Sequence, residues 1–334
     1  MGDQVRQTVA VIGGGSWATA IVKMLSEQDI KINWWLRSVS DIKHITKYHR
    51  NPSYLSTAKI NLNKVNPTND LKASVRDASI LIIVIPAAFV AEAISDLSQT
   101  DLKGKRIVSS IKGMVPDENL LITDYLKKHF RVEHHDLAVI SGPCHAEEVA
   151  MERQSYLTVA SEDEDFALQL ADLLRCHYIS VTTNTDIYGV EYSAVIKNIV
   201  SIACGIAHGL NFGDNFQAVL VSNALSEIKD FLDAVSQKER DINASAYLGD
   251  LLVTAYSQFS RNRTFGNMIG RGYSVKSAQM EMEMIAEGYY AAKSIHEIKQ
   301  EFEIELPIIE TVYHILYEKI SPIIEFQILK DKLK

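Results

Sequence analysis

Residues 8–22 read TVAVIGGGSWATAIV, an apolar run rich in β-branched residues that breaks into glycines and resumes with a helical pattern. The pattern predicts a strand, a phosphate-binding turn and a helix. Gly13, Gly15 and Ala18 occupy the small positions of G-x-G-x-x-G/A. The first permits a tight turn, the second admits a pyrophosphate close to the backbone, and the third lets the helix pack on the strand. The helix start offers N–H groups and partial positive charge to a dinucleotide, although a purely structural turn is the alternative.

Composition excludes several classes of protein. The chain has 334 residues, of which 47% are hydrophobic and 23% charged, so it can bury a large core in about two domains. Its net charge of -8, without a long basic run, argues against nucleic acid or an anionic membrane as the main partner. The N-terminus lacks an apolar signal core, which favours the cytoplasm. Three cysteines without C-x-x-C spacing predict buried thiols in a reducing compartment, and no metal site is expected.

Apolar runs after the first helix predict a sheet. They lie at residues 31–37, 78–86, 106–111, 137–141, 156–161 and 178–182. The run 78–86 is almost continuously apolar, as expected for a central parallel strand covered on both faces. From about Gly189 the strand signals vanish and long helical patterns follow. We therefore expect an α/β fold, with a dinucleotide-binding domain over residues 1–189 that contains a Rossmann-type doubly wound parallel sheet, followed by an all-α C-terminal substrate and catalytic domain over residues 190–334.

Candidate binding residues follow the strands, at the sheet edge where ligands bind in such folds. Arg37 stands where an acidic residue would bind the ribose of NAD, and it suits a 2′-phosphate, although a solvated arginine is the alternative. Lys112 suits an anionic substrate unless it is simply solvated. Gly142, followed by Pro143 and Cys144, allows close backbone approach to a ligand unless the Gly-Pro pair builds only a sharp turn.

A lysine lies inside the first helix of the second domain. The helix predicted over residues 191–205 is apolar nearly all round, which indicates a buried core element. Desolvation lowers the pKa of an ammonium group, so Lys197 is a candidate proton donor or acceptor near neutral pH. A lysine paired with a carboxylate, or snorkelling to the surface, is the alternative. The apolar run 194–206 contains this lysine and is too short to span a bilayer, so no integral membrane segment is expected.

Polar residues further along the chain suit a substrate that carries a carbonyl and a phosphate. Asp250, Thr254, Arg261 and Asn262 lie close together in sequence. Guanidinium groups match phosphate oxygens, and a carboxylate can orient an ammonium group. A polar loop between helices is the alternative. Residues 280–288 predict a methionine-rich helix that contributes to core packing.

The chain carries an ordered set of motifs: the turn from Gly13 to Ala18 with Trp17, Ile111-Lys112-Gly113, Ser141-Gly142-Pro143 with Ala146-Glu147-Glu148, Glu191 with Lys197-Asn198, Gly249-Asp250-Leu251, Ser260-Arg261-Asn262-Arg263 and Glu287-Gly288. This set resembles the NAD(P)-dependent glycerol-3-phosphate dehydrogenases, and more closely their bacterial form. The likeness covers essentially the whole chain. Each motif is modest, but the ordered set is specific.

The resemblance implies that Lys197 is the catalytic proton donor and acceptor on the substrate oxygen. Together with the candidates above, the expected substrate-binding residues are Lys112, Gly142, Cys144, Lys197, Asp250, Thr254, Ser260, Arg261 and Asn262. The expected cofactor-binding residues are Gly13, Gly15, Ser16, Trp17, Arg37, Lys112, Ala146, Arg261, Ile285 and Glu287. Cys144-His145 departs from the small hydroxyl residue and aromatic usual in the family, and this departure affects one expected hydrogen bond to the substrate.

The implied reaction is the reversible reduction of dihydroxyacetone phosphate to sn-glycerol 3-phosphate by NADPH or NADH, which feeds glycerophospholipid synthesis. We expect a cytoplasmic homodimer whose partner is this small phosphorylated substrate. Arg37 predicts that NADPH is accepted and preferred over NADH. Two alternatives stay open: another β-hydroxyacid dehydrogenase with a carboxylate substrate, and a non-catalytic dinucleotide-sensing protein.

Overall fold

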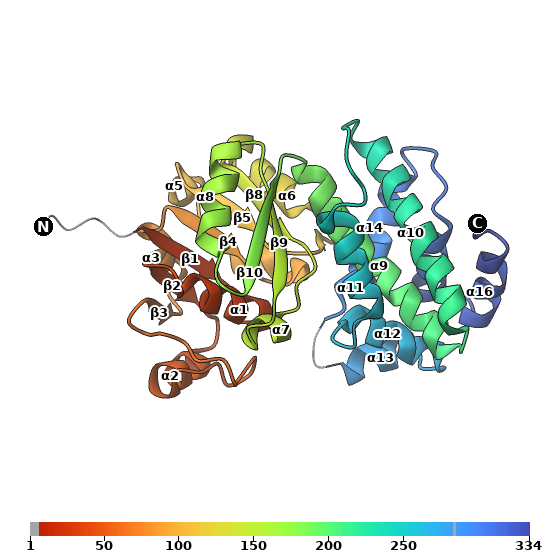
Figure 1. The fold of residues 1–334 in the computed structure, drawn as a ribbon, viewed down its shortest axis with the longest axis horizontal. Helices are drawn as coiled ribbons and strands as arrows, with labels where there is room; N and C mark the ends of the chain where they lie inside the picture. Colours follow the sequence, from red (N-terminus) through yellow and green to blue (C-terminus); the bar gives the residue numbers. More distant parts are fainter. Residues whose placement is uncertain (1–6, 283–284) are drawn as a thin grey trace, which may run out of the picture. The chain divides into compact units, whose positions relative to one another are not determined.

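The computed structural model describes residues 7–282 and 285–334, and these form two compact units (Figure 1). One unit comprises the residues up to Ile111 together with Ile122–Ile187. The other comprises Lys112–Leu121 and Tyr188–Lys334. The short segment that begins at Lys112 therefore belongs with the C-terminal helices, a feature that the sequence pattern did not predict.

Within the described residues, the first unit contains an 8-stranded sheet in the order β10-β9-β8-β5-β4-β1-β2-β3. Neighbouring strands are parallel, except that β9 pairs with β8 in the antiparallel sense. The expected doubly wound sheet is confirmed and is mostly parallel, with β9 and β10 running antiparallel to the other strands. The strands are β1 (Thr8–Ile12), β2 (Lys31–Trp35), β3 (Val65–Thr68), β4 (Ile80–Ile83), β5 (Arg106–Ser109), β8 (Leu137–Ser141), β9 (Ser155–Ala160) and β10 (Ile179–Asn184).

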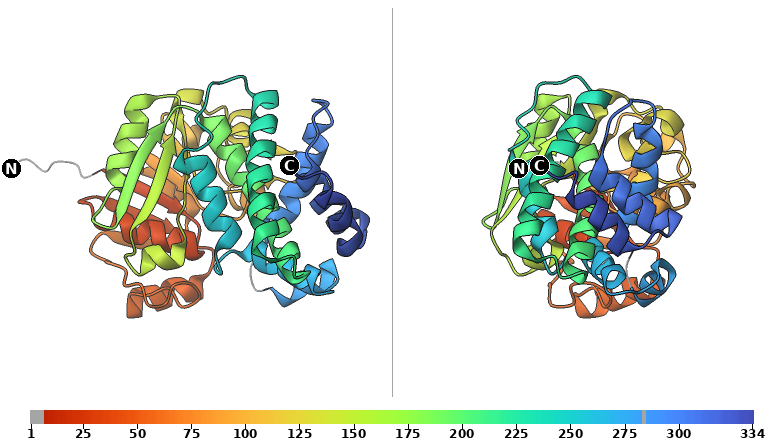
Figure 2. Two further views of the ribbon diagram at one scale, coloured as in Figure 1. Left: turned by 45° about the vertical axis from the view of Figure 1, so that its right-hand side comes forward. Right: turned by 90° about the vertical axis from the view of Figure 1, so that its right-hand side faces the viewer.

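Helices cover both faces of this sheet, as the views in Figure 2 show. Helix α1 contacts both α7 and α8, and α5 contacts both α3 and α6. The helices and helical turns are α1 (Ser16–Leu25), α2 (Val39–Tyr48), α3 (Leu71–Arg76), η1 (Ala87–Phe89), α4 (Val90–Ala93), α5 (Gln99–Leu102), α6 (Ile122–Phe130), η2 (His134–Asp136), α7 (Ala146–Ala150) and α8 (Glu164–Leu174).

The strand order reverses between β1 and β4, and this reversal places the glycine turn. The chain runs outward from β1 through β2 to β3 and then returns to the other side of β1 as β4. In open α/β sheets a ligand crevice forms at the carboxyl ends of the two strands at such a switch point. Strand β3 was not predicted because it contains Pro67, which a sheet tolerates at its edge.

The second unit is helical. Its elements are the hairpin β6 (Met114–Val115) and β7 (Leu120–Leu121), followed by α9 (Ile187–Gly209), α10 (Gly213–Val235), η3 (Ser245–Gly249), α11 (Asp250–Tyr256), α12 (Arg261–Gly270), α13 (Val275–Glu281), α14 (Glu287–Lys299), α15 (Pro307–Tyr313), η4 (His314–Glu318) and α16 (Pro322–Lys330). Helix α9 has 23 residues, so by length and composition it could cross a membrane, but 94% of its most apolar window is buried inside the protein. It is the central core helix that its sequence predicted, although longer.

Close contacts at glycine fix α9 against α12. A Cβ added at Gly205 of α9 would lie 2.1 Å from the carbonyl oxygen of Arg263, and one added at Gly266 of α12 would lie 2.1 Å from that of Ile202. Real Cβ atoms do not approach backbone oxygen so closely, so only glycine permits this crossing. The crossing brings the N-terminal turn of α12 beside the polar residues of α9.

Three local expectations are wrong. The methionine-rich stretch is not one helix, because α13 ends at Glu281 and α14 begins at Glu287, and Met280 is exposed rather than in the core. Met284 lies outside the described residues. Of the three thiols only Cys204 is buried, whereas Cys144 and Cys176 are partly exposed.

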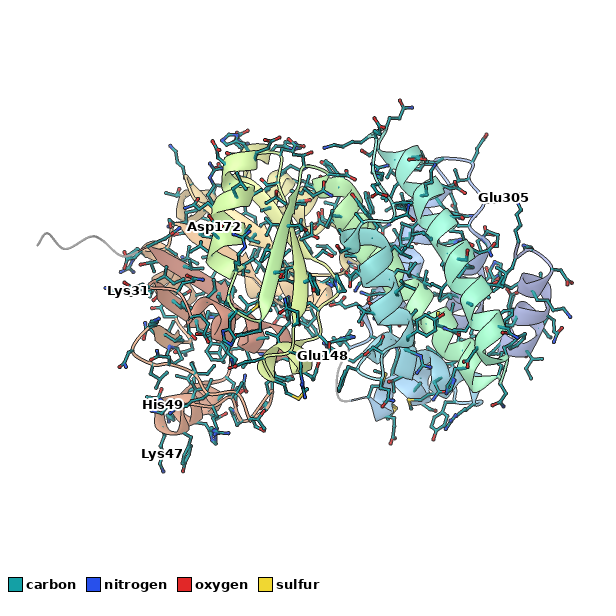
Figure 3. The ribbon with its side chains drawn as sticks, in the orientation of Figure 1. Lys31, Lys47, His49, Glu148, Asp172 and Glu305 are labelled. Atoms are coloured by element: carbon teal, nitrogen blue, oxygen red, sulfur yellow. The ribbon has the colours of Figure 1, made fainter. Side chains whose placement is uncertain are left out.

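Charged side chains mostly lie on the surface of each unit. Lys31, Asp172 and Glu305 are exposed and point outward in Figure 3. Charged groups that are buried therefore stand out, and the helical unit holds a cluster of them.

Candidate active site

The glycine turn of the first unit combines a fixed backbone with open space. Gly13 has φ 140°, and a Cβ there would lie 2.1 Å from the carbonyl oxygen of Val84, so this position is closed to any side chain. Gly15 precedes α1, and a Cβ there would meet nothing within 4 Å. The fold thus demands glycine at residue 13 but not at residue 15. A pyrophosphate close to the backbone would supply the reason for glycine at residue 15.

The start of α1 carries further predicted cofactor residues. Ser16 is its first residue and is buried. The indole N–H of Trp17 donates a hydrogen bond to Ser110 Oγ at 2.6 Å, which holds the ring beside the end of β5. Ala146 is the first residue of α7, which packs on α1. These residues therefore lie at helix starts or strand ends, where anions bind.

Arg37 follows β2 and is exposed. The next residue, Ser38, caps α2 by accepting a hydrogen bond from the N–H of Asp41. Arg37 therefore lies between a strand end and a helix start with its side chain in solvent. The position suits a ribose 2′-phosphate and equally permits a solvated arginine.

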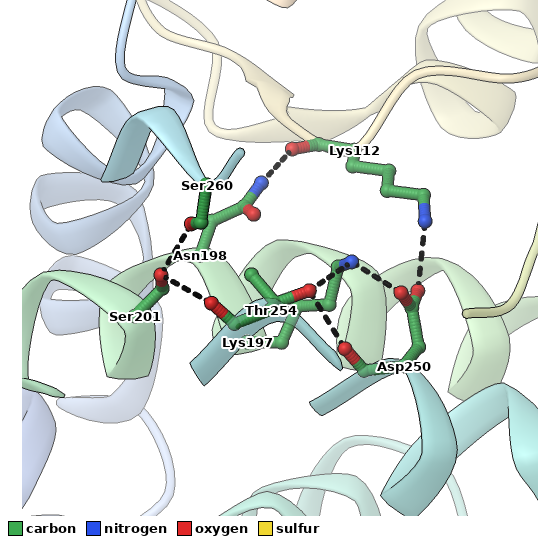
Figure 4. A network of polar contacts seen from close by, with 7 residues as sticks. All are labelled: Lys112, Lys197, Asn198, Ser201, Asp250, Thr254 and Ser260. Atoms are coloured by element: carbon green, nitrogen blue, oxygen red, sulfur yellow. Dashed lines mark hydrogen bonds and ion pairs between the residues drawn. The ribbon is translucent and has the colours of Figure 1, made fainter. Parts of the chain in front are cut away.

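Two lysines share one buried carboxylate in the helical unit (Figure 4). Lys197 of α9 donates to Asp250 Oδ1 at 2.5 Å, and Lys112 donates to Asp250 Oδ2 at 2.8 Å. Lys197 is 4% exposed and Asp250 is 1% exposed. A buried charge is tolerated only with a partner, and here one carboxylate serves two ammonium groups. Each oxygen of this buried carboxylate is therefore paired with an ammonium group.

The burial and the charges of this cluster shift its pKa values. Burial is the largest influence on Lys197 and lowers the pKa of its ammonium group; Lys112 acts in the same direction and Asp250 opposes it. Burial alone would raise the pKa of Asp250, but the two ammonium groups outweigh it and hold that pKa below its usual value. The lowered pKa makes Lys197 able to release a proton more readily than an ordinary lysine.

Thr254 completes the surroundings of Lys197. Its Oγ1 accepts a hydrogen bond from Lys197 Nζ at 2.8 Å and donates one to the carbonyl oxygen of Asp250 at 2.7 Å. An ammonium group has three N–H bonds, and Asp250 and Thr254 take two of them. Use of the third N–H bond on a substrate oxygen stays a prediction. On the same helix, Asn198 Nδ2 donates to the carbonyl oxygen of Lys112 at 2.6 Å and so fixes the backbone that carries Lys112.

A chain of hydroxyl groups links α9 to the start of α12. Ser201 Oγ lies 3.0 Å from the carbonyl oxygen of Thr254 and 2.7 Å from Ser260 Oγ. A carbonyl can only accept, so Ser201 donates to Thr254 and Ser260 donates to Ser201. Ser260 Oγ also accepts from the N–H of Arg263 at 3.3 Å and thereby caps α12. The sequence did not predict Ser201, although its spacing of one helical turn from Lys197 on an apolar helix was a signal.

The first turn of α12 presents donors. Arg261 is exposed. Asn262 is buried, and its Oδ1 accepts from the N–H of Gly288 at 2.9 Å, which leaves its Nδ2 as the donor for a ligand. The N-terminus of a helix adds partial positive charge. Donors of this kind match what a phosphate requires, and the binding of the substrate by Arg261 and Asn262 stays a prediction.

Gly142 has a structural reason to be glycine. Its φ is 112°, and a Cβ there would lie 2.8 Å from the carbonyl oxygen of Tyr156 on β9. The neighbouring Cys144 is partly exposed. The sharp turn is therefore present, and a role in substrate binding for these two residues stays a prediction.

The predicted cofactor residues are divided between the two units. Lys112, Arg261, Ile285 and Glu287 belong to the helical unit and the rest to the sheet unit. Ile285 is partly buried, and Glu287 is the first residue of α14. In the described parts of the chain, residues 7–282 and 285–334, no group of three or more His, Cys, Asp or Glu side chains is placed to hold a metal ion.

A dinucleotide turn in an α/β unit, and a buried lysine and carboxylate in a helical unit, define a class: the two-domain dehydrogenases that use a nicotinamide cofactor. The chain belongs to the NAD-dependent glycerol-3-phosphate dehydrogenase family. Residues 8–167 match the N-terminal part of that family and residues 186–326 match its C-terminal part.

Curated relatives cover almost the whole chain. A glycerol-3-phosphate dehydrogenase [NAD(P)+] of Staphylococcus epidermidis is 31% identical over 93% of this chain and 94% of its own length. One of Enterococcus faecalis is 33% identical over 94% of this chain and 92% of its own. The crystal structure of glycerol-3-phosphate dehydrogenase from Coxiella burnetii is 30% identical, with a TM-score of 0.91 over 98% of this chain and 99% of that one.

We expect the two outer glycines of the turn to respond differently to alanine. Gly15→Ala should fold with a melting temperature near that of the wild type, because its Cβ meets no protein atom, yet weaken NADPH binding by about tenfold or more. Gly13→Ala should lower stability by more than the roughly 1–3 kcal/mol that its positive-φ backbone costs, because the added Cβ would also collide with the Val84 carbonyl oxygen. Thermal unfolding and calorimetric titration with NADPH measure both effects. Unchanged NADPH affinity in Gly15→Ala would show that no phosphate approaches this residue.

Proposed function

We propose that the cluster of Lys112, Lys197 and Asp250 carries the proton step of the glycerol-3-phosphate dehydrogenase reaction. The family's reaction is the NAD(P)H-dependent, reversible reduction of dihydroxyacetone phosphate to sn-glycerol 3-phosphate. The observation that carries the proposal is a lysine buried in an apolar helix, held at Nζ by a carboxylate and a hydroxyl. Such a group has one N–H left for the substrate.

A bound NAD(P)H supplies the hydride that adds to C2 of the substrate carbonyl. Lys197 donates the proton that the carbonyl oxygen takes up as its negative charge develops. The positive charge of the Lys197 ammonium group stabilises that oxygen before the proton moves. In the reverse reaction neutral Lys197 accepts the proton of the C2 hydroxyl. General acid help of this kind typically accelerates a reaction by roughly 10²–10⁴-fold.

Asp250 acts on this step through its two partners. Its carboxylate fixes the position of Lys197 Nζ, and its charge keeps some of the Lys197 population protonated despite burial. Lys112, the more exposed of the two lysines, neutralises the second carboxylate oxygen. Thr254 accepts from Lys197 Nζ on a second side, so the lysine is oriented by two bonds rather than one.

We place the substrate phosphate at the start of α12. Arg261 provides a guanidinium group, Asn262 provides an amide, and the helix provides partial positive charge. The hydrogen bond from Gly288 to Asn262 fixes that amide, and the bond from Ser260 to Ser201 joins α12 to the helix that carries Lys197. The two ends of the substrate are thereby held by one rigid set of helices.

NADPH and NADH are the cofactors of this family, and the preference for NADPH is our proposal. It is supported by an exposed Arg37 where an acid would select NAD. A cytoplasmic location, a homodimer and a supply of glycerol 3-phosphate for glycerophospholipid synthesis are further proposals, which the membership of the family supports.

Lys197→Ala should reduce the turnover of dihydroxyacetone phosphate by at least about 10²-fold, because it removes the group proposed to protonate the substrate oxygen. Steady-state oxidation of NADPH measures turnover, and calorimetric titration checks that NADPH still binds. Lys229→Ala is a matched control, since Lys229 pairs with Asp233 on an exposed helix face. Turnover near the wild-type value in Lys197→Ala would return this lysine to a structural role.

Arg261→Ala should reduce kcat/KM for dihydroxyacetone phosphate far more than for unphosphorylated dihydroxyacetone, because only the first substrate carries the group that the guanidinium binds. A charge-assisted hydrogen bond of about 1.5–3 kcal/mol corresponds to roughly a 10- to 150-fold loss. Arg271→Ala, at the other end of α12, serves as the control. Equal losses on the two substrates would mean that Arg261 does not contact the phosphate.

A further inference from the structure

Asn51 is a polar residue that the reaction described above does not use. It lies between α2 and β3 and is 0% exposed. Its Nδ2 donates to the carbonyl oxygen of Gly14 at 3.0 Å and to Thr19 Oγ1 at 2.8 Å. Its Oδ1 accepts from the N–H groups of Ser53 and Tyr54 at 3.0 and 3.2 Å. A single side chain thus ties a distant loop to the middle of the glycine turn.

The partners fix the orientation of the Asn51 amide. The carbonyl oxygen of Gly14 can only accept, and the backbone nitrogens of Ser53 and Tyr54 can only donate. If the amide were flipped, its NH₂ group would face the N–H groups of Ser53 and Tyr54, and its oxygen would face the carbonyl oxygen of Gly14. The amide therefore uses both of its N–H groups on the glycine turn and on α1, and its oxygen on its own loop.

Holding the Gly14 carbonyl has a consequence for the next residue. A peptide unit is planar and trans, so its N–H points opposite to its C=O. Because Asn51 holds the carbonyl oxygen of Gly14 toward the protein interior, the N–H of Gly15 is directed away from it. Gly15 is also the residue at which an added Cβ would meet no protein atom.

The carbonyl groups on either side are held in the same manner. The Trp34 indole N–H donates to the carbonyl oxygen of Gly13 at 2.7 Å. The carbonyl oxygen of Gly15 accepts from Thr19 Oγ1 at 2.9 Å and from the Thr19 backbone N–H at 3.0 Å. Three successive peptide units are therefore held by interior donors, and the N–H groups of Gly14, Gly15 and Ser16 each point away from the held carbonyl of the same peptide unit.

We infer that Asn51 is a positioning residue for the pyrophosphate of the dinucleotide: it orients the central peptide of the glycine turn so that the turn is organised for an anion before the cofactor binds. Binding then costs less conformational freedom, since no peptide must rotate. The inference rests on the proposed use of this turn by NAD(P)H.

Asn51→Asp tests this function with the smallest change. The carboxylate keeps an acceptor for Ser53 and Tyr54, but it removes the donor and faces the Gly14 carbonyl oxygen with negative charge. We expect the Kd for NADPH, measured by calorimetric titration, to rise by about tenfold or more. In the kinetic assay, the KM for NADPH should rise by a larger factor than that by which kcat falls.

Two further variants separate positioning from folding. Asn61→Asp makes the same change at an exposed asparagine that accepts from the N–H of Asn63 in the same type of turn, and it should leave the Kd unchanged. Thr19→Val removes the hydroxyl that is hydrogen-bonded to both Asn51 and Gly15, and it should weaken NADPH binding. This variant tests the inference even if Asn51→Asp fails to fold. Thr19→Ser keeps the hydroxyl and should bind NADPH as the wild type does.

The outcomes are distinct. A wild-type protein that does not bind NADPH overturns the proposed use of the turn itself. In a second outcome the wild type binds NADPH, and Asn51→Asp or Thr19→Val binds it as tightly although the variant unfolds at a lower temperature. That result overturns the positioning role alone and leaves Asn51 as a structural residue.

Discussion

The Asp250 carboxylate lies between the ammonium groups of Lys112 and Lys197 and has almost no contact with solvent. Removing one partner from a buried ion pair costs about 3–5 kcal/mol, so none of the three groups can be lost without consequence for the others. Burial and the nearby Lys112 ammonium group lower the pKa of Lys197, whose positive charge provides the field that a developing alkoxide needs.

The helical unit keeps this cluster in place by close backbone contacts and a few polar links. Glycine in both α9 and α12 lets those helices touch, and the contact of Gly288 with the Asn198 carbonyl adds α14. Ser201 joins the Thr254 backbone to the cap of α12. The glycine turn of the other unit follows the same principle, because interior donors fix its carbonyl groups. In both places the groups proposed to bind ligand are held in position because the polar groups around them have hydrogen-bond partners.

The sequence predicted those features that depend on local pattern. The spacing of hydrophobic residues and the local composition were enough to predict the lysine in an apolar helix, the glycine turn after a strand, and most of the strands. Other features could not be predicted in this way. Strand β3 contains an edge proline, a loop separates α13 from α14, and β9 reverses direction, and none of these leaves a periodic signal in the sequence. Asn51 was missed for another reason: it acts on Gly14 and Thr19, far away in the chain, and only the fold brings them together. The spacing of Ser201 from Lys197 was a signal, but its partners Thr254 and Ser260 could be found only from the fold.

The most direct test of this account is the pH dependence of kcat/KM for the reduction of dihydroxyacetone phosphate, in the wild type and in Asp250→Asn. This parameter reports the pKa values of the free enzyme, and reduction requires protonated Lys197. The rate should fall as pH rises through the lowered pKa of Lys197. Because the Asp250 charge raises that pKa, the fall should begin at lower pH in Asp250→Asn. A fall at the same pH in both proteins, or at higher pH in the variant, would contradict the account.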